Sequence, residues 1–302
     1  MTKTINETIR IIPLGGVGEI GKAMYVVEID EEIFIVDSGL MFPENEMLGI
    51  DIVIPDVTYL EENKARIKGI FLTHGHEDAI GSISYLLNKI QAPVYGSRLT
   101  IALAKEHLKE LPAAQPVKFF EVTNKSRMNF KSTHVTFFHT THSIPDSLGI
   151  VFHTSEGAIV HTGEFKFDQA AKGSYRPDIA KMAGLGEEGV FILMSDSTEA
   201  ERPGYTTSES VVEEHLSETF HGAKGRILVS LYSSNFIRIQ QVFDTAIESR
   251  RKVAVVGKTL ETVFEVGKKL DYLQVDEETL ISIKDIGNYE DHEVVIIVSG
   301  TQ

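Results

Sequence analysis

One segment, FLTHGHEDAIG from Phe71 to Gly81, limits the folds open to this chain more than any other stretch. Apolar residues at 69–73 predict a strand, and a helical pattern begins directly after the polar cluster. His74, His76 and Asp78 stand at alternate positions just beyond that strand, where a loop can direct all three at one ion. Packing alone does not call for this spacing. The segment therefore predicts a metal site at a strand end.

Polar residues also follow other predicted strands. Asp37 ends a strand in FIVDSG, His142 follows the apolar stretch VTFFH, and Glu164 follows the strand at 157–162. Each alone would be an ordinary loop residue, but together they repeat the pattern of a polar strand end. Neutral imidazoles suit zinc or manganese, and carboxylates favour the harder metal. Other histidines are interpreted as structural because they lie within strands: His139, His153 and His161.

The order of the predicted elements indicates an α/β fold of stacked layers. Short β-branched segments dominate the first two hundred residues, with strands expected at 8–14, 23–29, 33–38, 69–73, 133–139, 148–154 and 157–162. Helices expected at 78–90, 97–110 and 176–184 would cover them. From residue 207 the pattern changes to alternating helices and strands, which predicts βα units with a parallel sheet and a domain boundary near 205–208.

Composition excludes several classes of function. Subtracting 44 acidic from 29 basic side chains leaves a formal charge of −15, which opposes broad electrostatic capture of nucleic acid or of an anionic membrane. A polyanion would therefore need a local groove. The chain has no Cys, so a metal must be bound by His, Asp and Glu. No signal peptide or long apolar run is present, which indicates a soluble cytoplasmic protein with no membrane association.

A glycine-rich loop superficially suggests a nucleotide site. Gly16, Gly18 and Gly21 fit the GxGxxG spacing after a strand. That motif needs a long helix directly after the glycines, whereas Lys22–Asp37 has the pattern of two strands joined by an acidic turn. We therefore expect a tight loop beside the substrate instead of a nucleotide-binding loop.

Longer strings are more specific than the histidine cluster alone. They include LGGVGEIGKAMYVVE, FPENEMLGIDIVIPD, LTHGHEDAIG, THSIPDS, TGEFKFD, SDSTEAERPGYT and SNFIRIQQV. Together they resemble the ribonuclease J family, the β-CASP group of the metallo-β-lactamase fold, over essentially the whole chain. The resemblance implies an αββα metallo-β-lactamase sandwich at 1–207 and an inserted β-CASP domain at 208–302. The latter is expected to be incomplete, because the chain ends directly after a strand.

The same resemblance implies roles for individual residues. Asp37 would orient the histidine loop, and Asp196 would be an acidic residue linked to the catalytic centre, acting with Asp78 and His76. The implied metal ligands are His74, His76 and His142 on one ion, Asp78 on a second ion, and Glu164 as the bridging carboxylate.

Two positions depart from the active form of the family. Ala79 replaces a histidine that would bind the second ion, and Glu164 replaces an aspartate. This combination resembles the less active of the two paralogous branches of the family in Gram-positive bacteria. We therefore expect a divalent metal, Zn or Mn, with one well-formed site and a weak second site.

The resemblance implies a metal-dependent ribonuclease with 5′-to-3′ exonuclease and endonuclease activity in RNA processing and decay, of low activity. An alternative is a catalytically degenerate partner that stabilises an active ribonuclease J paralogue, as a homodimer or in a mixed oligomer. A third possibility, a small-ester hydrolase of the same fold, is disfavoured by the region after residue 208.

Contacts to RNA are expected at two kinds of position. Ser233, Ser234 and Asn235 precede the amphipathic segment NFIRIQQVFDTAIES, where they would either cap a helix alone or also bind a phosphate. Three basic residues next to the motifs are candidates as well, with solvated surface charge as the alternative interpretation: Lys22, Lys166 and Arg238.

Overall fold

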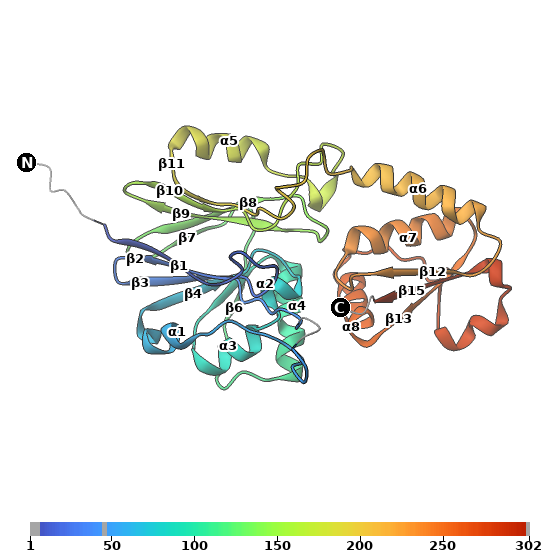
Figure 1. Cartoon of the computed structure of the whole chain (residues 1–302), viewed down its shortest axis with the longest axis horizontal. Coiled ribbons are helices and arrows are strands. Elements are labelled where there is room, and N and C mark those ends of the chain that lie inside the picture. The colour runs from blue at the N-terminus through green and yellow to red at the C-terminus, as the bar shows by residue number, and fades with distance from the viewer. Residues whose placement is uncertain (1–6, 44–46, 300–302) are drawn as a thin grey trace, which may run out of the picture. The chain divides into compact units, whose positions relative to one another are not determined.

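The structure is a computed structural model that describes residues 7–43 and 47–299. It separates into two compact units (Figure 1). The first unit contains residues up to 142, 146–165 and 175–202, and the second contains 143–145, 166–174 and the residues from 203 onward. The units are not continuous stretches of chain, and the division into domains at 1–207 and 208–302 stays a prediction.

The first sheet has six strands in sequence order. They are β1 (Ile9–Gly15), β2 (Met24–Ile29), β3 (Glu32–Val36), β4 (Ile67–Phe71), β5 (Val94–Gly96) and β6 (Phe119–Glu121). The first three are antiparallel neighbours, and β3 to β6 run parallel. Because β2 begins at Met24, no helix follows the glycine-rich loop, so the arrangement that a nucleotide-binding loop requires does not form.

The second sheet has five strands and packs on the first. Their order is β11 (Val190–Met194), β10 (Gly157–His161), β9 (Leu148–Thr154), β8 (His134–His139) and β7 (Arg127–Asn129). One apolar cluster joins both sheets, with Phe34 and Phe71 from the first and Phe137 and Phe152 from the second. All four side chains are buried, and alternate residues along each strand face this core.

Helices cover the outer faces of both sheets (Figure 1). On the first sheet lie α1 (Thr58–Glu62), α2 (Glu77–Ile80), α3 (Ile83–Lys89) and α4 (Arg98–Glu110), and on the second lies α5 (Ile179–Glu188). Leu185 of α5 packs in a second apolar cluster with Val151 and Val160. The layered α/β architecture expected from the sequence is confirmed.

The single helix expected at 78–90 is wrong, because α2 ends at Ile80 and α3 begins at Ile83. The break has a tertiary cause. Ser82 N donates to Ser38 O at 2.9 Å, and a Cβ at Gly81 would lie 2.4 Å from Leu40 Cγ. Contact with the loop after β3 therefore replaces helix continuation.

The second unit contains a parallel sheet, as predicted. Its order is β12 (Ile227–Leu231), β15 (Val294–Ser299), β13 (Lys252–Val256) and β14 (Leu280–Ile281), accompanied by α6 (Glu209–Gly222), α7 (Phe236–Glu248) and α8 (Lys258–Lys269). Short 3₁₀ turns complete the described elements of the whole chain, at Lys64–Arg66, Gly173–Tyr175, Ile283–Asn288 and Asp291–Glu293. Within the described residues, every helix is too short or too polar to cross a membrane.

His161 ends β10 in an apolar setting and makes the fold sensitive to acid. Its side chain is 8% exposed, its ring meets the ring of Tyr25 edge-on, and its Nδ1 accepts a hydrogen bond from Gly163 N at 3.1 Å. Burial lowers the pKa of His161 from 6.5 to about 4. Between these two pH values the unfolded chain binds a proton at His161 that the folded chain excludes.

We predict that the free energy of unfolding falls as the pH drops from 6.5 to about 4, with His161 contributing on the order of 3 kcal/mol to that loss. His161→Gln should flatten this part of the profile in urea titrations. His215→Gln, at an exposed histidine of α6, serves as the matched control. Parallel profiles for wild type and His161→Gln would contradict the assignment.

Candidate metal centre

The site is built on a close contact between two loops. Asp37 follows β3 in the left-handed backbone region, with a φ of 62°, and its N donates to Phe71 O at 2.9 Å. At Gly39 a Cβ would lie only 1.5 Å from Asp78 O, so a side chain there would displace α2. Ala23 N donates to that same carbonyl at 3.0 Å. The Asp-x-Gly segment therefore fixes the backbone position of Asp78.

A hydrogen-bond chain runs from Asp37 to His74. Asp37 is 2% exposed, and its carboxylate accepts hydrogen bonds from Thr73 N at 2.7 Å and from Thr73 Oγ1 at 2.8 Å. Thr73 Oγ1 lies 2.9 Å from His74 Nδ1. Because Thr73 donates its one hydroxyl proton to Asp37, its oxygen accepts the Nδ1 proton of His74. This tautomer leaves the lone pair of His74 on Nε2.

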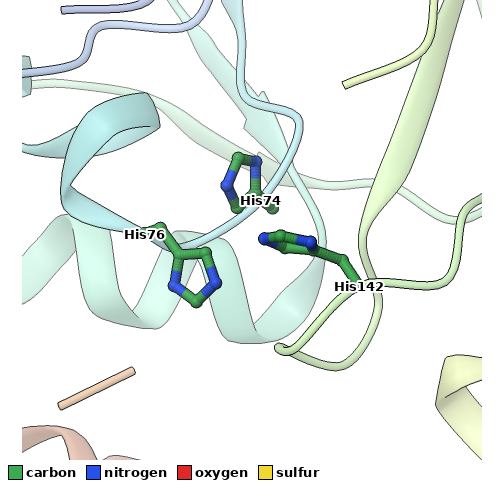
Figure 2. Close-up of side chains that lie close together, drawn as sticks. All are labelled: His74, His76 and His142. Atoms are coloured by element: carbon green, nitrogen blue, oxygen red, sulfur yellow. The ribbon is translucent and has the colours of Figure 1, made fainter. Parts of the chain in front are cut away.

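Three imidazoles gather at the strand ends (Figure 2). His74 and His76 lie on the loop after β4, and His142 lies on the loop after β8, with ring centroids 4.8–5.0 Å apart. The ring nitrogens of the three fall within 4.8 Å of one another. Among the described residues, His74 Nε2 is buried without a hydrogen-bond partner. A buried acceptor nitrogen without a hydrogen-bond partner is suited to bind a metal ion.

Two carboxylates complete the cluster. Glu164 Oε2 lies 3.1 Å from His142 Nε2 and 3.9 Å from His74 Nε2, and Asp78 Oδ1 lies 3.8 Å from His74 Nε2. Ligands about 2.0–2.1 Å from a tetrahedral ion are roughly 3.4 Å apart, so these separations match those of a metal site. The structure thus brings together all five residues that the resemblance implied as ligands.

Burial sets the charge state of the ligand side chains. It lowers the pKa of His74 and of His76 well below 6.5, and the neighbouring His142 adds to both shifts. The two imidazoles are therefore neutral at pH 7, which is the form that binds a metal. Burial, together with Glu164, raises the pKa of Asp78 well above its usual value. A bound cation would oppose this last shift, since it favours the carboxylate.

His74 belongs to both possible ligand groups, one with His76 and His142 and the other with Asp78 and Glu164. The two groups therefore share a nitrogen that can serve one ion. Ala79, where a further imidazole would stand in the active form, has a completely buried side chain. A weak second ion stays a prediction that this geometry favours.

Asp196 lies outside both ligand groups in the described structure. It follows β11, where its N donates to Thr162 Oγ1 at 3.1 Å and its Oδ1 accepts from Thr198 N at 2.8 Å. Burial raises the pKa of Tyr25, and the charges of Asp37 and Asp196 raise it further. Asp37 and Asp196 thus both act on Tyr25, while the link of Asp196 to the catalytic centre stays a prediction.

Four of the residues proposed to contact RNA have side-chain partners within the protein: Lys22, Lys166, Asn235 and Arg238. Asn235 caps α7 by accepting from Arg238 N at 3.1 Å, and Lys22 pairs with Glu19 at 3.1 Å. Ser233 and Ser234 directly precede this cap. Glu209 holds both remaining cations, with Lys166 Nζ at 2.6 Å and Arg238 Nη2 at 3.0 Å. Lys166 and Arg238 are therefore partly buried and paired with Glu209, and contact of either with RNA stays a prediction.

Sequence reasoning missed Thr73, although it directly precedes the first histidine. A hydroxyl at the end of an apolar strand was the available signal. It could not be interpreted without knowing that Asp37, thirty-six positions earlier, lies beside it.

The chain is similar to known proteins over its whole length. A model of the metallo-beta-lactamase superfamily matches residues 17–198, and a model of the ribonuclease J beta-CASP domain matches residues 224–302. Proteins named Ribonuclease J 2 from Staphylococcus aureus (strain MRSA252) and Staphylococcus saprophyticus are each 57% identical over all 302 residues. The chain spans 54% of the length of these relatives.

A crystal structure of a protein of unknown function from Enterococcus faecalis V583 shares the fold. It has a TM-score of 0.67 at 12% identity, and the match covers 97% of this chain and 77% of that one. By fold and ligand cluster, the chain belongs to the metallo-beta-lactamase superfamily. Within it, the chain is a member of the ribonuclease J family, as its sequence strings indicated.

We predict that Thr73→Val weakens metal binding about 10- to 100-fold, because the substitution removes the hydroxyl that orients His74. Competition with a chromogenic chelator would measure the affinity directly, without any activity assay. Thr73→Ser keeps the hydroxyl and is the matched control. Equal affinities for Thr73→Val and wild type would rule out this orienting role.

Proposed function

We propose that this chain carries the metal centre of a ribonuclease that hydrolyses phosphodiester bonds in RNA. The observation that carries the proposal is the five-residue ligand cluster around the unsatisfied Nε2 of His74. The 57% identity to proteins named Ribonuclease J 2 supports RNA as the substrate. The activity would be 5′-to-3′ exonucleolytic and endonucleolytic, in RNA processing and decay, and it would be weak.

His74, His76, His142 and Glu164 would hold the principal ion, with Asp78 beside them. A divalent ion held by these residues, zinc or manganese, would supply Lewis-acid activation of water and of the phosphate. Asp37 acts through Thr73 to keep the lone pair of His74 directed at the cluster. Desolvation, together with the charge of His142, lowers the pKa of His76 well below 6.5, which favours the neutral, metal-binding imidazole at physiological pH.

Asp78 is proposed as the general base that accepts the proton of the attacking water. Its backbone is fixed against Gly39, and its Oδ1 stands 3.8 Å from His74 Nε2. From there the carboxylate can orient the attacking water and accept its proton as the 3′ oxygen leaves. Asp196 would contribute electrostatically, since it lies outside the ligand cluster.

A second candidate function is supported by Ala79 and Glu164. The buried methyl group of Ala79 replaces an imidazole, and Glu164 is one methylene longer than the aspartate of the active family form. Both changes weaken the case for a second ion without removing the first site. In this alternative the protein stabilises an active ribonuclease J paralogue, as part of a homodimer or mixed oligomer.

An experiment with the purified chain separates the two candidates. The substrate is a 5′-monophosphorylated RNA, assayed with Zn²⁺ or Mn²⁺, and His74→Ala is the matched control without the central ligand. Metal-dependent cleavage by the chain alone, lost in His74→Ala, supports the enzyme. No cleavage alone, together with stimulation of an added paralogue that persists in His74→Ala, supports the partner role and contradicts the enzyme.

We also predict that Ala79→His combined with Glu164→Asp increases metal content and nuclease rate, because the pair restores the ligand set of the active form. The comparison is made in a full-length protein of the family that contains this sequence. Metal analysis and RNA cleavage are measured on the same preparation. A higher metal content with an unchanged rate would show that the deficit lies elsewhere.

A further inference from the structure

The second unit contains a cavity that the proposed mechanism does not use. Its volume is about 310 Å³, near the lower end of the range for small-ligand pockets. Residues 166–170 form one wall, and Thr206, Ser208 and Ser210 at the start of α6 form the other. All of these residues belong to the same compact unit.

The charges around the cavity disfavour an anionic ligand. Asp168 lies in its wall, is buried, and accepts hydrogen bonds from Ser208 Oγ at 2.9 Å and from Glu209 N at 3.0 Å. The side chain of Ser208 caps Ser210 N at 3.4 Å. The first N–H groups of α6 are therefore already bound to oxygens of the chain, one of them a carboxylate, and a phosphate placed there would be repelled.

The two nearby cationic side chains, Lys166 and Arg238, are already paired with a carboxylate. Glu209 receives Lys166 Nζ and Arg238 Nη2 on its two carboxylate oxygens, and Arg238 Nη1 additionally donates to Gln241 Oε1 at 2.6 Å. The positive charge of Lys166, the one basic residue in the cavity wall, is thus largely neutralised. The cavity suits an uncharged ligand with polar edges.

One aromatic side chain gives the cavity a stacking surface. Phe167 lines the wall and is 66% exposed, so a large part of its ring is accessible to a ligand in the cavity. Gln169 and Thr206, both exposed, place an amide and a hydroxyl in the same lining. An aromatic face with neighbouring amide and hydroxyl groups is the chemistry that binds an unpaired nucleobase.

We propose that this cavity accepts one base of single-stranded RNA, stacked on Phe167. The inference rests on the proposed function, because it takes RNA as the substrate. It adds a base-binding position next in sequence to the ligand Glu164, which precedes Phe167 by three residues. Phe167 would position the RNA and take no part in the chemistry.

The test measures binding of a short, single-stranded RNA with a 5′ monophosphate and a cleavage-resistant phosphorothioate backbone to the zinc-loaded chain. Phe167→Ala should weaken binding by roughly 5- to 150-fold, the range for loss of one stacked base. A series of oligonucleotides, each lacking one base, locates the stacked position. Removing that base should weaken binding to wild type and have no further effect on Phe167→Ala.

Two variants control the measurement. Phe167→Trp keeps an aromatic face and should bind nearly as tightly as wild type. Tyr205→Ala removes another exposed aromatic of the same unit, one outside the cavity lining, and should leave the affinity unchanged. Thermal unfolding verifies that each variant is folded. We expect all of them to fold, because the side chains of Phe167 and Tyr205 are exposed and lie outside the core.

The outcomes separate this inference from the proposed function. Normal RNA binding and cleavage by Phe167→Ala would overturn the base-binding inference and leave the ribonuclease proposal standing. Failure of the wild-type chain to bind RNA would overturn both. The inference would also be overturned if every oligonucleotide that lacks a base bound more weakly by the same factor, and if Phe167→Ala changed none of these differences.

Discussion

The hydrogen bonds from Thr73 to the buried carboxylate of Asp37 are the interaction on which the metal centre depends. A carboxylate in the interior needs donors, because burial penalises its charged form. Here both donors come from the residue before His74, so satisfying Asp37 also sets the tautomer of His74. Loop geometry and ligand chemistry are therefore determined by the same contact.

The two-sheet core explains why the ligands converge. Phe71 and Phe137 come from different sheets, yet they pack in one apolar cluster, with ring centroids 6.3 Å apart. The strands that contain them, β4 and β8, precede the loops that carry His74 and His142. Burial of large aromatic side chains thus brings two segments that are distant in the sequence close together in space. The polar residues at the ends of their strands then meet at the edge of the core.

The acidic balance of the chain and the pairing of Lys166 and Arg238 both reduce the positive charge beside the cavity of the second unit. The formal charge is −15, and in the second unit Lys166 and Arg238 share the carboxylate of Glu209. RNA binding in this region would therefore depend less on phosphate neutralisation than on stacking and polar contacts. An exposed aromatic such as Phe167 gains importance in that setting, since base stacking does not require net positive charge.

Local pattern alone determined much of this protein: the strand and helix periodicities, the parallel sheet of the second unit, and the polar strand ends that carry His74, His142 and Glu164. These follow from short-range periodicity, which is visible in the sequence. Tertiary structure alone decided the break after α2, the role of Thr73 and the partners of Lys166. Each depends on a contact with a distant segment, and such contacts exist only once the sheets have packed.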